Sequence, residues 1–276
     1  MNKADGNLHT WLGDVLNDGD LHTWLSDALK QRMSRRLKNG LGKAICLATK
    51  TARATGDDNS IAICGGACNA DIPHDYDIYQ LGTQLSLSDV LSDVQSDKCF
   101  TVLSRSRNAL TVCYSGKVLQ FCTYTKPTLS ELVESFDFAH IQAGVQLHIQ
   151  PDCNTVDIHN VEFTPDYMKA HISDTTWFTG SDYPLSSIMR VCKYKERGVF
   201  GDKSWRLAML QAFVAAAIRG FKDYDDFKDQ LAAIDLFITD DGNEVYTAYK
   251  QLAEHGFVTV LHDGEDDGFE NPLDAR

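Results

Sequence analysis

The chain has 276 residues, of which 43% are apolar, and its 39 acidic side chains outnumber 26 basic ones to give a formal charge of -13. This length is enough to bury a large core, in one elaborate domain or two modest ones. The acidic charge argues against a protein that coats nucleic acid, and no apolar run reaches the roughly eighteen residues of a membrane span. We therefore expect a soluble cytoplasmic protein with no membrane partner.

The first 56 residues predict amphipathic helices packed on the core. Apolar side chains recur at helical spacing over residues 8–16 and 21–29, and the unit L-H-T-W-L-x-D-x-L occurs at Leu8 and again at Leu21. Two copies are too few for a solenoid. The tryptophans of this unit, Trp11 and Trp24, are expected either to cover the core or to dock a partner.

Two segments concentrate basic side chains in an otherwise acidic chain. Residues 28–56 hold eight bases and no acid, and a second group spans residues 190–206. Such patches either bind phosphate-bearing ligands or form solvated helix faces. The first patch, from Lys30 to Arg53, slightly favours RNA as an acceptor.

The middle of the chain predicts a mixed sheet. We expect strands over residues 61–64, 75–81, 100–103, 109–114, 118–124, 136–150 and 155–163. A helix is predicted over residues 86–97, and the capping box from Thr128 to Glu131 starts a short one. Polar and apolar residues alternate from Ala139 to Ile149, which places His140 on an exposed polar face.

The remaining residues predict helices again. Thr164 and Pro165 open one helix, and others are expected over residues 204–218 and 243–254. The fold class is therefore α+β: a helical segment over residues 1–56, a mixed-sheet core over 57–163, a helical region over 164–262 and an acidic, disordered tail over 263–276. The eight cysteines, which show no zinc-site spacing, are expected to be reduced core residues.

One short stretch carries candidate chemistry. Asp75 and Asp77 project from the same face of a strand, and two such carboxylates bind hard cations such as magnesium. Gly65 and Gly66 follow a buried strand, where glycine lets the backbone approach a phosphate. Without the glycines, the acid pair would be read as a surface turn.

The order of these features resembles a known fold. Gly-Gly, eight residues and then D-x-D resembles the nucleotidyltransferase fold of DNA polymerase beta and CCA-adding enzymes. The motifs N-A-L-T at 108–111, V-L-Q-F at 118–121, F-D-F at 136–138 and R-V-C-K-Y-K-E-R-G at 190–198 resemble nucleotidyltransferase-like proteins of phages and large DNA viruses. The resemblance covers residues 60–200, and it implies a protein of the host cytoplasm.

The resemblance implies a magnesium-dependent, ATP- or other nucleoside-triphosphate-binding transferase. It would move a nucleotidyl group to an acceptor hydroxyl of RNA, such as tRNA, or of a protein, with two Mg²⁺ ions on Asp75 and Asp77. The residues expected to bind the nucleotide are Gly65, Gly66, Arg190, Lys193 and Arg197.

The resemblance also implies a third carboxylate, and the sequence leaves its identity open. The expected strand, residues 118–122, carries Gln120 where the acid would stand. The candidates are Asp137, Asp157 or no third acid at all. Two alternative functions follow: a nucleotide-binding or protein-interaction module that has lost catalysis, or a synthase of a nucleotide second messenger.

Overall fold

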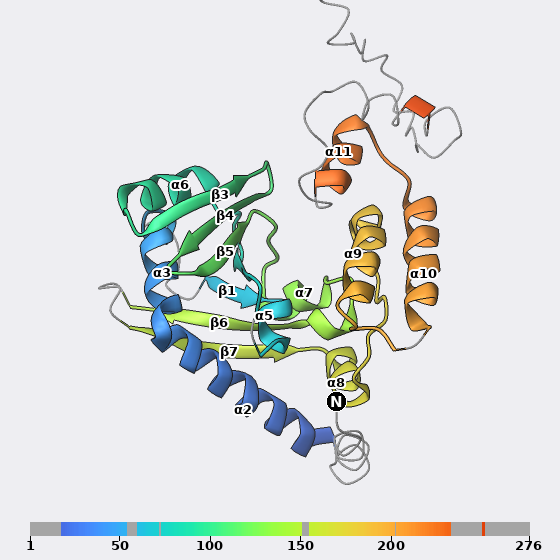
Figure 1. Ribbon diagram of the computed structural model, residues 1–276, viewed down its shortest axis with the longest axis horizontal. Helices are drawn as coiled ribbons and strands as arrows, with labels where there is room; N and C mark the ends of the chain where they lie inside the picture. Colours follow the sequence, from blue (N-terminus) through green and yellow to red (C-terminus); the bar gives the residue numbers. More distant parts are fainter. Residues whose placement is uncertain are drawn as a thin grey trace, which may run out of the picture.

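The computed structural model describes residues 18–53, 60–71, 73–150, 155–201, 203–232 and 250–251. In these residues N-terminal helices cover one face of a mixed sheet, and the C-terminal helices α9 (Pro184–Glu196) and α10 (Ser204–Arg219) lie beside it (Figure 1). The α+β class is therefore confirmed. Trp11, the acidic tail and nearly all of the predicted helix over residues 243–254 lie outside the described residues.

The sheet has seven strands in the order β3-β4-β5-β2-β1-β6-β7. Strands β2 and β5 are parallel, and the other neighbouring pairs are antiparallel. All the predicted strands are present, with these bounds: β1 Ile61–Cys64, β2 Tyr76–Gln80, β3 Phe100–Arg105, β4 Ala109–Tyr114, β5 Lys117–Cys122, β6 Ala143–Ile149 and β7 Val156–Phe163.

The helices precede, interrupt and follow the sheet. They are α2 Asp18–Arg36, the π-helix η1 Leu37–Leu41, α3 Gly42–Ala48, α4 Lys50–Arg53, α5 Gly66–Asn69, α6 Leu87–Ser96, α7 Leu129–Glu134, the 3-10 helix η2 Ala139–Ile141, α8 Pro165–Ser173, α9 Pro184–Glu196, α10 Ser204–Arg219 and α11 Tyr224–Ala232. None of the helices in the described ranges is long and apolar enough to cross a membrane.

Hydroxyl side chains start three helices as the sequence predicts. Ser86 accepts a hydrogen bond from the Asp89 backbone at the start of α6. Thr128 accepts one from the Glu131 backbone at the start of α7. Thr164 accepts from the backbone of Tyr167, 3.1 Å away, and Pro165 is the first residue of α8. Each cap satisfies a backbone donor that has no partner within its helix.

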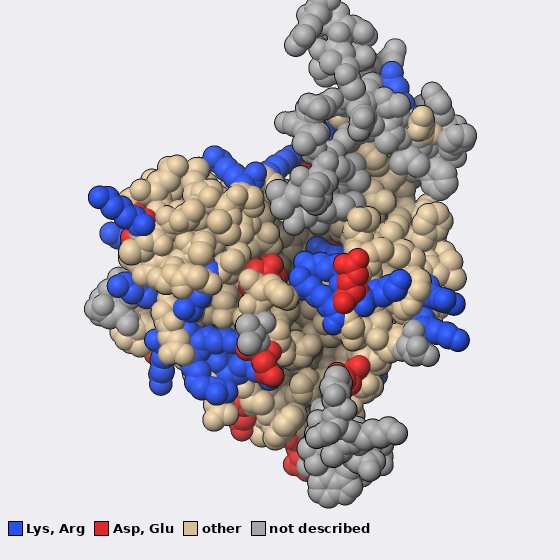
Figure 2. Space-filling view, in the orientation of Figure 1, with Lys and Arg blue, Asp and Glu red and all other residues tan. Residues whose placement is uncertain are grey.

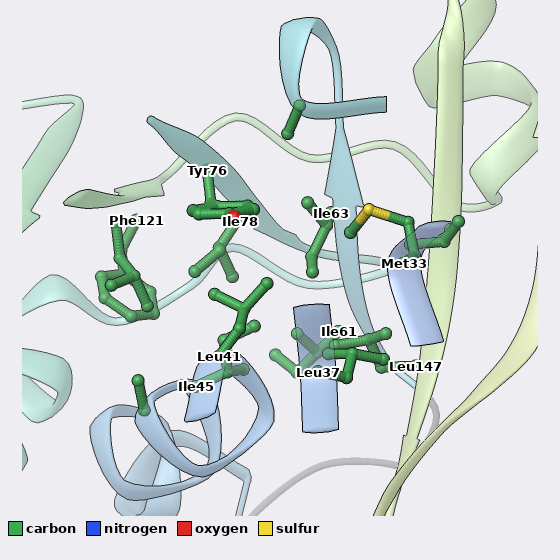
Figure 3. Close-up of a cluster of buried hydrophobic side chains, with 14 of the residues drawn as sticks. Met33, Leu37, Leu41, Ile45, Ile61, Ile63, Tyr76, Ile78, Phe121 and Leu147 are labelled. Atoms are coloured by element: carbon green, nitrogen blue, oxygen red, sulfur yellow. The ribbon is translucent and has the colours of Figure 1, made fainter. Parts of the chain in front are cut away.

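The main core lies between the N-terminal helices and one face of the sheet. Figure 3 shows Met33, Leu37, Leu41 and Ile45 from the helices against Ile61, Ile63, Ile78 and Phe121 from the strands. Full burial of each such side chain contributes roughly 1.5–3 kcal/mol. In the described residues, the N-terminal helices thus share one core with the sheet.

The opposite face of the sheet is only partly covered. Helix α7 packs over β1 and β6, where a Cβ on Gly144 would lie 2.6 Å from Cys64 Sγ and 2.9 Å from Leu129 Cδ1. Helices α9 and α10 form a separate cluster around Phe138, Val191 and Ala208 beside the sheet. This arrangement places α9 opposite the strand ends that carry the acid pair (Figure 1).

The predicted strand over residues 136–150 is wrong in its first half, because β6 begins only at Ala143. Before it, the backbone bonds to the segment around Phe178: Ala139 donates to Trp177 and Thr179 donates to Asp137. His140 is consequently buried, not exposed, with Nδ1 2.8 Å from Thr176 Oγ1. A contact with a distant segment has overridden the local alternation.

The cysteines differ in part from the expectation. Among the described residues, Cys64 and Cys68 are buried free thiols, as expected, whereas Cys99 and Cys192 are exposed free thiols. Cys46 is disulfide-bonded. The single spacing of the cysteines along the chain did not indicate this bond.

Candidate functional site

The glycine pair and the acid pair lie together at the ends of β1 and β2. Cys64, the last residue of β1, is the register partner of Asp77 on β2. Gly65 turns the chain with φ of +76°, a conformation that favours glycine, and a Cβ there would lie 3.4 Å from Asp77 Oδ2. The loop backbone therefore approaches the acid directly.

The acid pair is electrostatically strained. Burial and the neighbouring Asp75 raise the pKa of Asp77 to about 7, although Arg190 and Lys193 act to lower it. Asp77 belongs to the half-buried face of β2, and Asp75 is also half-buried, just before the strand. The pair therefore forms a concentrated negative site that a cation would stabilise.

Cations face this site from α9. Arg190 and Lys193 act on Asp77, whereas Arg197 lies at the C-terminal end of α9, where it acts on His140. In Figure 2 basic side chains gather over α9 beside a hollow that separates it from the sheet. The structure thus brings Asp75, Asp77, Arg190 and Lys193 together and leaves Arg197 at the edge of the group.

The position next to Asp77 on the sheet is occupied by an amide. Gln120 on β5 is the register partner of Asp77, and its Nε2 donates to Thr111 Oγ1 over 3.3 Å. The described residues contain no group of three or more His, Cys, Asp or Glu side chains that could hold a metal ion. Gln120 therefore lies beside the acid pair, and within the described part of the chain no third acid accompanies the pair.

The two candidates for a third acid lie elsewhere. Asp157 is exposed on β7, an edge strand separated from β2 by β1 and β6. Asp137 is buried, and both of its oxygens bind α9: Oδ2 accepts from Ser187 Oγ over 2.6 Å, and Oδ1 accepts from Arg190 Nη1 over 2.9 Å. Asp137 thus touches the site through Arg190.

The sequence missed the role of two arginines in the first basic patch. Arg36 on α2 donates to the backbone carbonyls of Ala67, Ala70 and Asp71, and Arg32 donates to those of Cys68 and Asn69. These carbonyls belong to α5 and the residues after it, between the glycine pair and the acid pair. The arginines therefore hold this loop, and their spacing of four residues was the available signal.

Asp75 and Asp77 suit a magnesium ion. Magnesium is usually held by one or two carboxylates and completes its octahedral shell with water and substrate phosphates. The pair supplies oxygen ligands alone, and the charge repulsion on Asp77 is the kind that a divalent cation relieves. Gln120 in place of an acid leaves these two carboxylates as the acidic oxygen donors for the ions that the sequence led us to expect.

No family model and no curated protein matches this sequence. Solved structures do match, at low similarity. A Thermotoga maritima CCA-adding enzyme in complex with tRNA is 10% identical, with a TM-score of 0.42, over 79% of this chain and 50% of that one. A CCA-adding enzyme in complex with CTP is 10% identical, with a TM-score of 0.42, over 77% and 49%.

A tRNA-processing enzyme in an apo form is 12% identical, with a TM-score of 0.43, over 86% of this chain and 60% of that one. The chain therefore spans between half and three fifths of the length of these structures. The predicted closeness to phage and viral proteins gains no support from the sequence comparisons.

Proposed function

We propose that the protein is a magnesium-dependent nucleotidyltransferase that uses a nucleoside triphosphate. The observation that carries the proposal is the position of Asp75 and Asp77 beside the Gly65 turn, where the cations of α9 act on Asp77. A metal-bound polyphosphate suits this site, because it presents a cation to Asp75 and Asp77 and anionic oxygens to Arg190 and Lys193.

Each group in the site has a part in the proposed reaction. Asp75 and Asp77 hold the ion, which supplies charge neutralisation at the phosphates. Arg190 and Lys193 bind phosphate oxygens, and Gly65 admits the triphosphate to the backbone. The acceptor hydroxyl oxygen bonds to the α-phosphorus and releases its proton to water while the bond to pyrophosphate breaks. The protein therefore acts by positioning and electrostatics.

Incubation with Mg²⁺ and each of four α-labelled nucleoside triphosphates tests the proposal. One set of reactions contains a pool of RNA, and the other contains no added acceptor, so that label can appear only on the protein itself or in a small soluble product. We expect pyrophosphate release and label transfer, and a loss on the order of 100-fold in Asp77→Asn, which removes a charge at the reaction centre. Asp157→Asn, which changes an exposed acid on β7, is the matched control and should retain the wild-type rate. A wild-type protein that releases no pyrophosphate refutes the transferase.

A nucleotide-binding module without catalysis is the second candidate, favoured by Gln120 beside Asp77. It predicts that nucleoside triphosphate and Mg²⁺ bind in calorimetry although pyrophosphate release stays at background with every acceptor pool. Gln120→Glu then separates the two candidates. Release that appears only in this variant supports the module, and release already present in the wild-type protein supports the enzyme.

A further inference from the structure

Asp137 is among the most completely buried charged groups of the described residues, yet it lies in a loop between α7 and η2. Its side chain is 1% exposed, and its two oxygens accept from Ser187 and Arg190. Its own carbonyl accepts from the Thr179 backbone over 3.0 Å. The carboxylate is therefore fixed by the backbone on one side and by α9 on the other.

Arg190 lies between two carboxylates. Its Nη1 binds Asp137, which is the main cause of the raised pKa of the guanidinium, and its charge also acts on Asp77 across the hollow. The side chain is 37% exposed. One part of the guanidinium is thus bound to a buried carboxylate, and the side chain remains partly exposed.

The pairing of Asp137 with Arg190 affects both metal binding and phosphate binding at the site. A free arginine opposite Asp75 and Asp77 would pair with them and compete with a metal ion for their oxygens. An arginine also has about 2 kcal/mol of side-chain entropy, which is lost when it binds a ligand unless it is already held in place. Asp137 reduces both costs, because it already pairs with Arg190 and holds its guanidinium in one place.

We propose that Asp137 is a positioning residue that, with Ser187, holds the Arg190 guanidinium ready for the phosphate oxygens of a metal-bound polyphosphate. The proposal rests on the proposed function, because it concerns the same phosphate site. It replaces the role of third metal ligand with one exerted through Arg190. Ser187 lies one helical turn before Arg190 on α9, so both partners of Asp137 come from one helix face.

The test is calorimetric binding of inorganic tripolyphosphate in the presence of Mg²⁺, which probes the phosphate site without a nucleobase. Asp137→Asn keeps the shape and an acceptor oxygen but removes the charge, and we expect it to weaken binding about 10-fold. Ser187→Ala removes one hydrogen bond and should weaken it about 3-fold. Asp157→Asn, the exposed acid on β7, is the matched control and should bind as the wild type does.

A second measurement separates positioning from a structural role. Arg190→Gln should also weaken binding, and the double variant Asp137→Asn/Arg190→Gln should bind no more weakly than Arg190→Gln alone, because both changes remove the same held guanidinium. Additive losses of binding would contradict positioning. Thermal unfolding of every variant confirms that binding is measured on folded protein.

The possible failures are distinguishable. A wild-type protein that binds no tripolyphosphate refutes the proposed function, and the inference falls with it. A wild-type protein that binds, together with Asp137→Asn protein that binds equally tightly, overturns the inference alone. If Asp137→Asn weakens Mg²⁺ binding in the absence of tripolyphosphate as much as it weakens tripolyphosphate binding, Asp137 is a metal ligand and the positioning role is wrong.

Discussion

The chain has two basic segments, one on α2 and one on α9. They look alike in sequence, but their side chains have different partners in the structure. On α2, Arg32 and Arg36 point inward and donate to backbone carbonyls of the loop that follows Gly66. On α9, Arg190 is held by one buried carboxylate, and it and Lys193 face a second carboxylate group across a hollow. Figure 2 shows both basic groups on one face of the molecule.

The two segments differ in how much of their positive charge remains available to a ligand after contacts within the protein are formed. Arg32 and Arg36 donate to backbone carbonyls, and Arg32 also pairs with the exposed Asp71 over 3.5 Å. Arg53 of the same segment is buried against Thr49. These contacts reduce the number of basic side chains in the first patch that are available to bind RNA. Its exposed basic residues are Lys30, Arg35, Lys38, Lys43 and Lys50. In contrast, the positive charges of Arg190 and Lys193 on α9 act on the acid pair, where we propose that a phosphate ligand binds. A basic run is therefore evidence for anion binding only after its internal partners are known.

The largest effect on stability is expected at the carboxylate partner of α9. Arg190→Met leaves the buried Asp137 without its cation and should lower the free energy of unfolding by about 3 kcal/mol, at the lower end for such a pair because Arg190 is partly exposed. Arg190→Lys keeps the charge and should recover most of this loss. Urea unfolding at pH 7 measures both. Equal losses in the two variants would show that charge is not what Asp137 requires.

The corresponding change on α2 is expected to behave differently. Arg36→Met removes three charge-assisted hydrogen bonds to carbonyls and should cost about 2 kcal/mol, given their partial exposure and non-additivity. Arg36→Lys should recover little, because one ammonium cannot reach all three carbonyls in the geometry of a planar guanidinium. Full recovery in the lysine variant would remove the distinction between the two segments. The measurement is the same urea titration.

The attachment of α9 through His140 predicts a pH dependence. Burial, with a contribution from Arg197, lowers the pKa of His140 to about 3. Between pH 6.5 and 3 the unfolded chain binds a proton that the folded protein does not, so stability is lost as the pH falls through this window. At pH 5 this amounts to about 2 kcal/mol.

The variant His140→Gln isolates this contribution. The loss of unfolding free energy between pH 7 and pH 5 should be about 2 kcal/mol smaller in the variant than in the wild type. Asp77, whose pKa is raised, contributes with the opposite sign, but it is present in both proteins and cancels in the difference. An identical pH dependence in the two proteins would mean that His140 accepts its proton in the folded state.

The smallest effect compares two exposed lysines. Lys193→Gln on α9 should weaken tripolyphosphate binding about 2-fold at low ionic strength, since it removes one exposed charge near the acid pair, and the effect should shrink in high salt. Lys30→Gln on α2 is the matched control and should bind as the wild type does. Calorimetry in 20 mM and about 300 mM salt checks both at roughly 20 Å and 5 Å screening lengths. Equal effects of the two changes would reduce α9 to a general source of positive charge.

Local patterns predicted most of the fold and the centre of the site. The strands and the caps at Thr128 and Thr164 follow from alternation and capping, which depend on neighbours within a few residues. The position of Gln120 beside Asp77 was expected from the resemblance to nucleotidyltransferases. The start of β6 and the burial of His140 were wrong, because residues 137–139 bond to a segment about forty positions later. No local pattern contains that partner.

The amino-acid sequence by itself determined the α+β class, the glycine turn before the acid pair and the presence of an amide where a third acid was expected. Each of these depends on residue type and short-range spacing. Only the tertiary structure decided which cations face the acid pair and what Asp137 binds. A side chain in a long-range contact takes the partner that packing brings within about 3 Å, and charge or spacing along the chain does not specify that partner.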